Sequence, residues 1–80
     1  MTFNEAAEAI KTLSSRPSNE TLLQLYALFK QGTEGDVTGN RPGLLDPKGR
    51  AKFDAWTQKK SLSKEESQQQ YIALVKTLLK

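Results

Sequence analysis

Residues 22–29 constrain the fold of this chain more than any other segment. The run reads Leu-Leu-Gln-Leu-Tyr-Ala-Leu-Phe, so that a helix built from it is apolar almost all the way round. Such a helix has to be buried on more than one side. We therefore predict a central helix over about residues 20–34, capped by Ser18 or Asn19.

Two capping boxes predict helices at the two ends of the chain. Thr2 and Ser63 are each followed three residues later by glutamate, a pattern that satisfies free N–H groups at a helix start. The first helix is expected over about residues 3–15, because Pro17 cannot continue it. The last helix is expected to start after Ser63 and to carry an apolar stripe made of Tyr71, Ile72, Leu74, Val75, Leu78 and Leu79.

A long connection separates the central helix from a third one. Five glycines and prolines between residues 35 and 47 exclude regular structure from about 35 to 46, and Asp46 before Pro47 is typical of a helix start. We predict a helix over about residues 47–60 and a loop of unusual length before it. The pair Leu44-Leu45 leads us to expect that this loop packs down on the bundle. The chain as a whole is predicted to be all-α.

The composition bounds the function. Eighty residues allow one domain, taken as residues 1–80. The chain has no cysteine and no histidine, so a thiolate zinc site is impossible, only oxygen ligands remain for a metal, and the commonest catalytic base is missing. No paired carboxylates stand out either, and we expect neither an enzyme nor a bound metal or cofactor.

Targeting signals are not evident in the sequence. Residues 1–15 lack a basic start followed by an apolar run, and no stretch approaches the roughly 20 apolar residues of a membrane span. We expect a soluble cytoplasmic monomer without integral membrane insertion.

Positive charge is concentrated in one segment. The net charge is +3, but residues 41–60 contain six basic and two acidic side chains. A solvated basic face, a small anionic ligand and a nucleic acid are three explanations of this pattern.

Three neighbouring side chains suggest a ligand with a base and a phosphate. Tyr26, Phe29 and Lys30 lie three and four residues apart, which predicts one shared helix face. An adenine stacked on an aromatic face gains about 1 to 3 kcal/mol. The alternative is that both rings belong to the core and that Lys30 extends its ammonium group to water. Lys52 and Trp56 repeat the pairing in the third helix, although a single tryptophan is more often structural.

Five segments of the chain together form a specific pattern of residues and spacings: Tyr26-Ala27-Leu28-Phe29-Lys30-Gln31, Gly35-Asp36, Arg41-Pro42-Gly43, Lys52-Phe53-Asp54-Ala55-Trp56 and Tyr71-Ile72. In order and spacing they resemble the acyl-CoA-binding protein family. The resemblance implies a four-helix up-down-down-up bundle, in which the long loop lets helices two and three run parallel. It also implies non-enzymatic binding and transport of long-chain fatty acyl-CoA esters, with acyl-CoA-using enzymes as possible partners.

The resemblance implies roles for single residues. Tyr26 and Lys30 match the family residues that embrace the CoA head group, and Lys52 matches the lysine that joins them at the ribose 3'-phosphate. Tyr71 matches a tyrosine that contacts the nucleotide. On the first helix, Ala7 matches the small residue that admits the ligand, and Lys11 matches a nearby cation that faces its phosphates.

Some positions depart from the family pattern. Phe29 and Phe53 stand where tyrosine and tryptophan are usual, so one hydroxyl and some aromatic surface are lost. Gly32 replaces an alanine, and Ser61 replaces a glycine in the predicted turn between the last two helices.

Two other binding functions compete with acyl-CoA carriage. The basic segment would suit a nucleic-acid-binding module, but its aromatic residues lie on apolar helices and a net charge of +3 is small for that purpose. A protein-interaction bundle is the other alternative. We therefore expect acyl-CoA as the ligand and no nucleic-acid partner.

Overall fold

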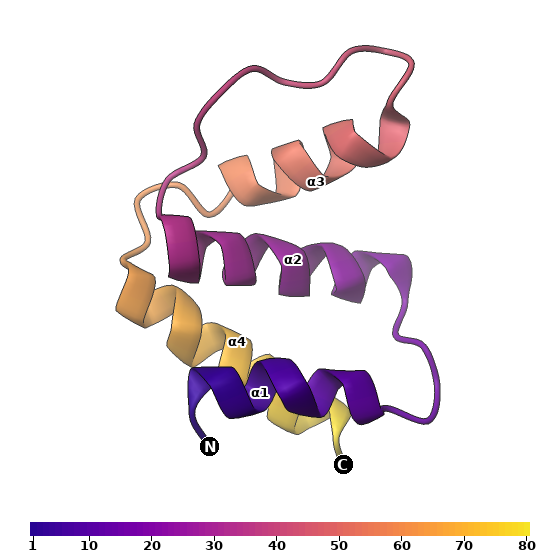
Figure 1. Cartoon of the computed structure of the whole chain (residues 1–80), viewed down its shortest axis with the longest axis vertical. Coiled ribbons are helices and arrows are strands. Elements are labelled where there is room, and N and C mark those ends of the chain that lie inside the picture. Colours follow the sequence, from indigo (N-terminus) through magenta and orange to yellow (C-terminus); the bar gives the residue numbers. More distant parts are fainter.

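The structure is a computed structural model that describes residues 1–80, and all of its regular elements are helical (Figure 1). This agrees with the predicted all-α class. The elements are α1 (Phe3–Ala9), a 3-10 turn η1 (Ile10–Thr12), α2 (Asn19–Glu34), α3 (Pro47–Thr57) and α4 (Lys64–Leu78).

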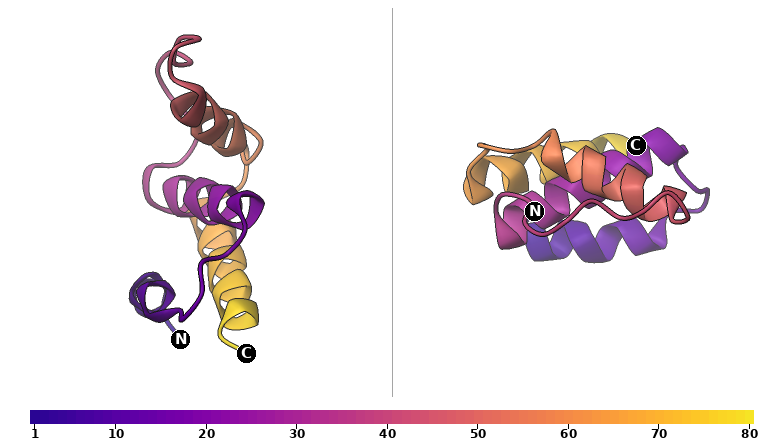
Figure 2. Two further views of the ribbon diagram at one scale, coloured as in Figure 1. Left: turned by 90° about the vertical axis from the view of Figure 1, so that its right-hand side faces the viewer. Right: turned by 90° about the horizontal axis from the view of Figure 1, so that it is seen from above.

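Helix α2 is the middle layer of the bundle. It packs against α3 on one side and α4 on the other, while α1 packs against α4 (Figure 1). The molecule is consequently flat, with extents of 36 × 28 × 15 Å (Figure 2). Helices α2 and α3 run in the same direction, opposite to α1 and α4, which is the up-down-down-up order. The central position of α2 explains why its sequence is apolar on more than one side.

Side-chain caps begin all four α-helices. The hydroxyl of Thr2 accepts a hydrogen bond from the Glu5 N–H at 3.1 Å, and the hydroxyl of Ser63 accepts one from the Glu66 N–H at 3.0 Å. Ser18, rather than Asn19, caps α2. The Asp46 carboxylate accepts from the Gly49 N–H at 3.0 Å. The four helix starts could thus be located from local sequence alone.

The core lies between α1, α2 and α4. The residues buried there are Ala6, Leu25, Leu28, Tyr71 and Val75. On the other side of α2, Ala55 and Trp56 of α3 are buried. The small size of Ala6 and Ala27, which are fully buried, lets the helices approach closely.

Two helices end earlier than their sequence patterns predict. The first ends in the 3-10 turn at Thr12 and not near residue 15. In this turn the Thr12 hydroxyl donates to the Ala9 carbonyl at 2.7 Å. The third ends at Thr57, and bonds of the i to i+3 type then tighten the chain as far as Leu62. The spacing of apolar residues alone does not show where an α-helix changes to tighter turns.

The expectation that Leu44 and Leu45 pack down is wrong. Leu44 is 84% exposed and Leu45 is 100% exposed. They lie in a turn in which the Asp46 N–H donates to the Gly43 carbonyl at 3.0 Å. The loop spans the length of α3 and brings this turn to the outside of the bundle (Figure 1).

The turn between α3 and α4 has a strained residue where the resemblance implies glycine. Ser61 has a φ of 82° and is the only non-glycine residue with positive φ. This conformation costs an L-residue about 1 to 2 kcal/mol. The Ser61 N–H donates to the Asp36 carboxylate at 2.9 Å, and this bond secures the turn.

Substitution of Ser61 by glycine is expected to stabilise the fold. The strain energy removed from the folded state exceeds the entropic cost of the extra freedom of glycine in the unfolded chain. The free energy of unfolding should therefore rise by about 0.5 to 1 kcal/mol. For a domain of this size the melting temperature should rise by about 2 to 8 °C, measured by circular dichroism. The reverse change at Gly39 is the matched control, because Gly39 has a φ of 88° and open space around it. Gly39→Ser should lower the melting temperature, and an unchanged or lowered value for Ser61→Gly would contradict the strain.

Candidate ligand site between helices α2 and α3

Two lysines and two aromatic rings pair across the parallel helices α2 and α3. The Lys52 ammonium lies 5.3 Å from the centre of the Tyr26 ring. The Lys30 ammonium lies 5.1 Å from the centre of the Trp56 ring. Both contacts have the geometry of cation–π interactions. Lys30 follows Tyr26 by four positions in α2, and Trp56 follows Lys52 by four positions in α3. The two pairs therefore lie one helical turn apart along the interface.

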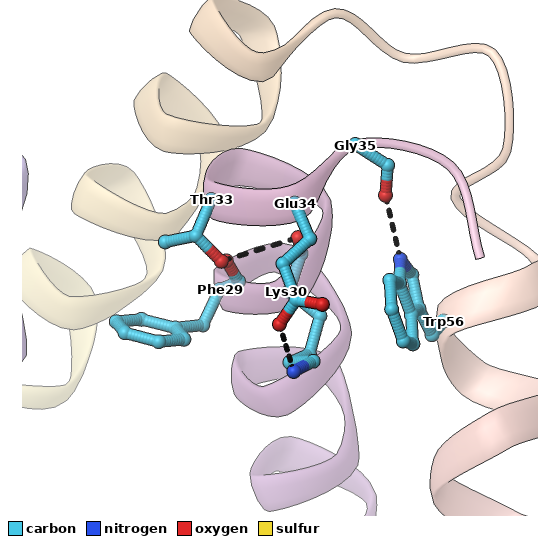
Figure 3. A network of polar contacts seen from close by, with 6 residues as sticks. All are labelled: Phe29, Lys30, Thr33, Glu34, Gly35 and Trp56. Carbon is cyan, nitrogen blue, oxygen red and sulfur yellow. Dashed lines mark hydrogen bonds and ion pairs between the residues drawn. The ribbon is translucent and has the colours of Figure 1, made fainter. Parts of the chain in front are cut away.

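Lys30 already has an anionic partner. Its ammonium group pairs with the Glu34 carboxylate one turn further along α2 (Figure 3). The hydrogen bond from Lys30 to Glu34 raises the pKa of the lysine above its ordinary value. The lysine side chain is 25% exposed, between Glu34 and Trp56. An incoming anion would compete with this carboxylate for the ammonium group.

The shared face predicted for Tyr26, Phe29 and Lys30 is divided. Tyr26 and Lys30 meet α3, whereas Phe29 leaves α2 on another side (Figure 3). Neighbouring positions in a helix differ by about 100°, so Phe29 and Lys30 cannot face the same helix. The Phe29 ring stacks on the ring of Phe3 with centroids 5.4 Å apart, and its centroid lies 5.9 Å from that of Tyr71. The side chain of Phe3 therefore covers part of the surface that an adenine was expected to cover.

An open groove adjoins Tyr26 and Lys52. It has a volume of about 510 Å³, within the range of small-molecule sites. Its wall combines leucines of α2 with cationic side chains from the connection before α2 and from the first half of α3. The lining residues are Arg16, Asn19, Leu22, Leu23, Tyr26, Pro47, Lys48, Ala51 and Lys52.

A second groove lies on the other side of the contact between α2 and α3. It has a volume of about 500 Å³ and shares Leu23 and Ala51 with the first groove. Leu74 of α4 also lines it, as does Ala55 of α3. The contact between α2 and α3 is thus open on both sides of an apolar ridge.

Polar bonds hold the start and the middle of the long loop. The Trp56 indole N–H donates to the Gly35 carbonyl at 2.9 Å (Figure 3). Arg41 donates two hydrogen bonds to the Asp54 carboxylate, at 2.9 and 2.7 Å. This guanidinium lowers the pKa of the Asp54 carboxyl below its ordinary value. The matched Arg41-Pro42-Gly43 segment therefore fixes the loop to α3.

The other predicted site residues lie away from the α2–α3 interface. Lys11 is exposed in η1 and pairs with Glu8 at 3.4 Å. Ala7 of α1 is half-buried against the core. The Tyr71 ring belongs to the core itself, and burial raises the pKa of its hydroxyl.

Sequence reasoning overlooked most of the groove. Leu22 precedes Tyr26 by four residues, and Lys48 precedes Lys52 by four, so helical spacing from the two predicted residues would have found them. Arg16 and Asn19 come from the connection before α2 and its first turn, and no local signal marks them. Trp56, interpreted as structural, is buried and also underlies Lys30.

None of the helices is both long enough and apolar enough to cross a membrane. No three acidic side chains are grouped closely enough to hold a metal ion.

Comparisons with known proteins agree with this fold. The family described as acyl CoA binding protein matches residues 1–75. Acyl-CoA-binding protein homolog 1 of Caenorhabditis elegans is 53% identical over 79 residues, covering 99% of this chain and 92% of the relative. The homolog of Manduca sexta is 56% identical over 78 residues, covering 96% and 87%.

Solved structures show the same architecture. The crystal structure of acyl-CoA-binding protein 2 of Oryza sativa superposes with a TM-score of 0.92 at 51% sequence identity, covering 96% of this chain and 86% of that one. The structure from Moniliophthora perniciosa gives a TM-score of 0.89 at 38% identity, covering 96% and 76%. With its helical bundle and its match over nearly the whole length, the chain belongs to the acyl-CoA-binding protein family.

Proposed function

We propose that this protein binds long-chain fatty acyl-CoA esters and carries them in the cytoplasm as a monomer, for delivery to enzymes that use them. The observation that carries the proposal is the position of Tyr26 and Lys52, which form a cationic and aromatic end of a groove floored by leucines. Members of this family are binding proteins and not enzymes. The site accordingly needs to hold and shield its ligand, without reacting with it.

Lysines suit the phosphates of the CoA head group. Lys30 and Lys52 extend from different helices toward the same interface, where they could converge on one anion. Charge-assisted hydrogen bonds to phosphate are roughly twice as strong as neutral ones. We assign Lys52 and Lys30 to the ribose 3'-phosphate and Tyr26 to the head group beside them. Lys30 would exchange Glu34 for the phosphate.

The acyl chain is assigned to the floor of the groove. Leu22, Leu23 and Ala51 line it, and the second groove lies on the other side of Leu23 and Ala51. Each buried methylene gains about 0.8 kcal/mol, which would otherwise drive a long chain into micelles or membranes. Shielding of the chain makes a carrier useful.

Four residues are assigned to the nucleotide from the other side of α2. Phe29 is 38% exposed and leaves part of its ring free for a base, next to Tyr71. Ala7 and Lys11 lie on the first helical segment, as a small residue and as a cation one turn apart. The Lys11 ammonium would face the phosphates, exchanging its weak exposed pairing with Glu8.

Calorimetric titration tests the proposal. Affinity is expected to rise with acyl chain length and to level off once the groove is filled, because each methylene adds at most about 0.8 kcal/mol. Free CoA and palmitate should each bind far more weakly than palmitoyl-CoA, and a short DNA should not compete. Equal affinity for CoA and palmitoyl-CoA would exclude an acyl groove, and equal affinity for palmitate would indicate a fatty-acid protein.

A further inference from the structure

The tip of the loop between α2 and α3 presents two leucines to solvent in a fixed position. Leu44 and Leu45 are the most exposed of the large hydrophobic residues. The turn that holds them is closed by the bond between the Asp46 N–H and the Gly43 carbonyl. The two hydrogen bonds from Arg41 to Asp54 tie the preceding segment to α3. The exposure of Leu44 and Leu45 is therefore a feature of the folded loop.

Positive charge follows the leucines in the chain, at the start of α3. Lys48 and Arg50 belong to the first turn of α3, and neither takes part in the ion pairs of the structure. The nearby Asp46 carboxylate is engaged in capping α3. The loop tip thus combines two exposed leucines with basic side chains in the first turn of α3, a pattern that suits an anionic lipid surface.

We propose that this loop tip docks the protein on anionic phospholipid membranes. Leu44 and Leu45 enter the boundary between head groups and acyl chains, and Lys48 and Arg50 face lipid phosphates. A protein partner fits less well, because two leucines fall far short of the roughly 800 Å² per partner of a stable interface. A bilayer needs no such complementary surface.

Docking in this orientation places the groove at the membrane. Pro47 and Lys48, which follow the leucines by two and three residues, line the groove that adjoins Tyr26 and Lys52. The opening of the groove at this end would face the lipid surface. Docking does not depend on acyl-CoA binding, so either property can fail alone.

Vesicle flotation of the full chain, without acyl-CoA, tests the proposal. The wild type should float with vesicles of phosphatidylcholine and phosphatidylserine, and more weakly with phosphatidylcholine alone. Salt at about 0.5 M should reduce this binding, because it screens the basic side chains. The double variant Leu44→Ser with Leu45→Ser should lower the partition coefficient about tenfold or more, since two leucines leave the interface.

Two controls separate docking from other effects. Leu79→Ser removes a leucine that is 42% exposed at the other end of the chain, and it should leave flotation unchanged. Melting temperature and palmitoyl-CoA affinity of the double variant should match those of the wild type, because neither leucine is buried or lines the groove. Equal flotation of wild type and double variant, or no flotation of the wild type with phosphatidylserine, overturns the proposal.

Discussion

Replacement of Lys52 by alanine is expected to weaken palmitoyl-CoA binding by about 2 to 5 kcal/mol. That is the usual cost of leaving a partly buried charge without its partner, whereas an exposed surface charge contributes less than about 1 kcal/mol. Lys52 lies over the Tyr26 ring at the groove, where a bound phosphate would be partly shielded from water. Isothermal titration of wild type and variant measures the difference.

The 3'-phosphate can be removed from the ligand as well as its lysine from the protein. Against the dephospho-CoA ester, Lys52→Ala should cost much less than against intact palmitoyl-CoA. The four affinities form a cycle whose coupling energy reports the contact directly. Lys76→Ala on the outer face of α4 is a matched control and should change neither affinity. If wild type and Lys52→Ala lose equal affinity when the phosphate is removed, Lys52 does not bind that group.

Replacement of Tyr71 by alanine should lower the free energy of unfolding by about 3 to 5 kcal/mol, the usual loss for a large aromatic residue in a core. The Tyr71 ring is 4% exposed. Its centroid lies 5.2 Å from that of Phe3 and 5.9 Å from that of Phe29. Since small domains have only about 5 to 15 kcal/mol of stability, urea unfolding should show a large shift of the midpoint.

Tyr26 offers a comparison between two tyrosines with different surroundings. It is half-buried and lines the groove, so Tyr26→Ala should cost less stability than Tyr71→Ala and more affinity per folded molecule. Tyr71→Phe keeps the ring and should fold as the wild type does, which allows the role of the hydroxyl in nucleotide binding to be measured separately. A stability loss from Tyr71→Ala below about 1 kcal/mol would contradict its place in the core.

Local sequence was sufficient for the helix starts and for the central helix. A cap such as that of Thr2 or Ser63 acts within one turn, and its hydrogen bonds depend only on residues three positions apart. The apolar run of residues 22–29 required cover on more than one side, and α3 and α4 provide it. The resemblance to the family supplied the order of the helices, which periodicity alone does not determine.

The residues of the groove could be predicted from the sequence only in part. Tyr26 and Lys52 were identified from their residue types, and the structure brings them together. Arg16 could not be predicted as part of the groove, because no pattern in the nearby sequence marks it. It lies there only because of the path that the chain takes before α2. The strain at Ser61 could be suspected from the expected glycine, but its φ of 82° is a property of the folded turn.

By itself, the sequence determined where helices begin, that the second one is central, and which side chains have the chemistry to hold a phosphate or a base. Only the tertiary structure decided that Phe29 stacks on Phe3 while Lys30 lies over Trp56, and that Leu44 and Leu45 face solvent. The physical reason is the distance along the chain over which each effect acts. Caps and periodicity act over three or four residues, whereas the side on which a ring is covered depends on which distant helix packs there.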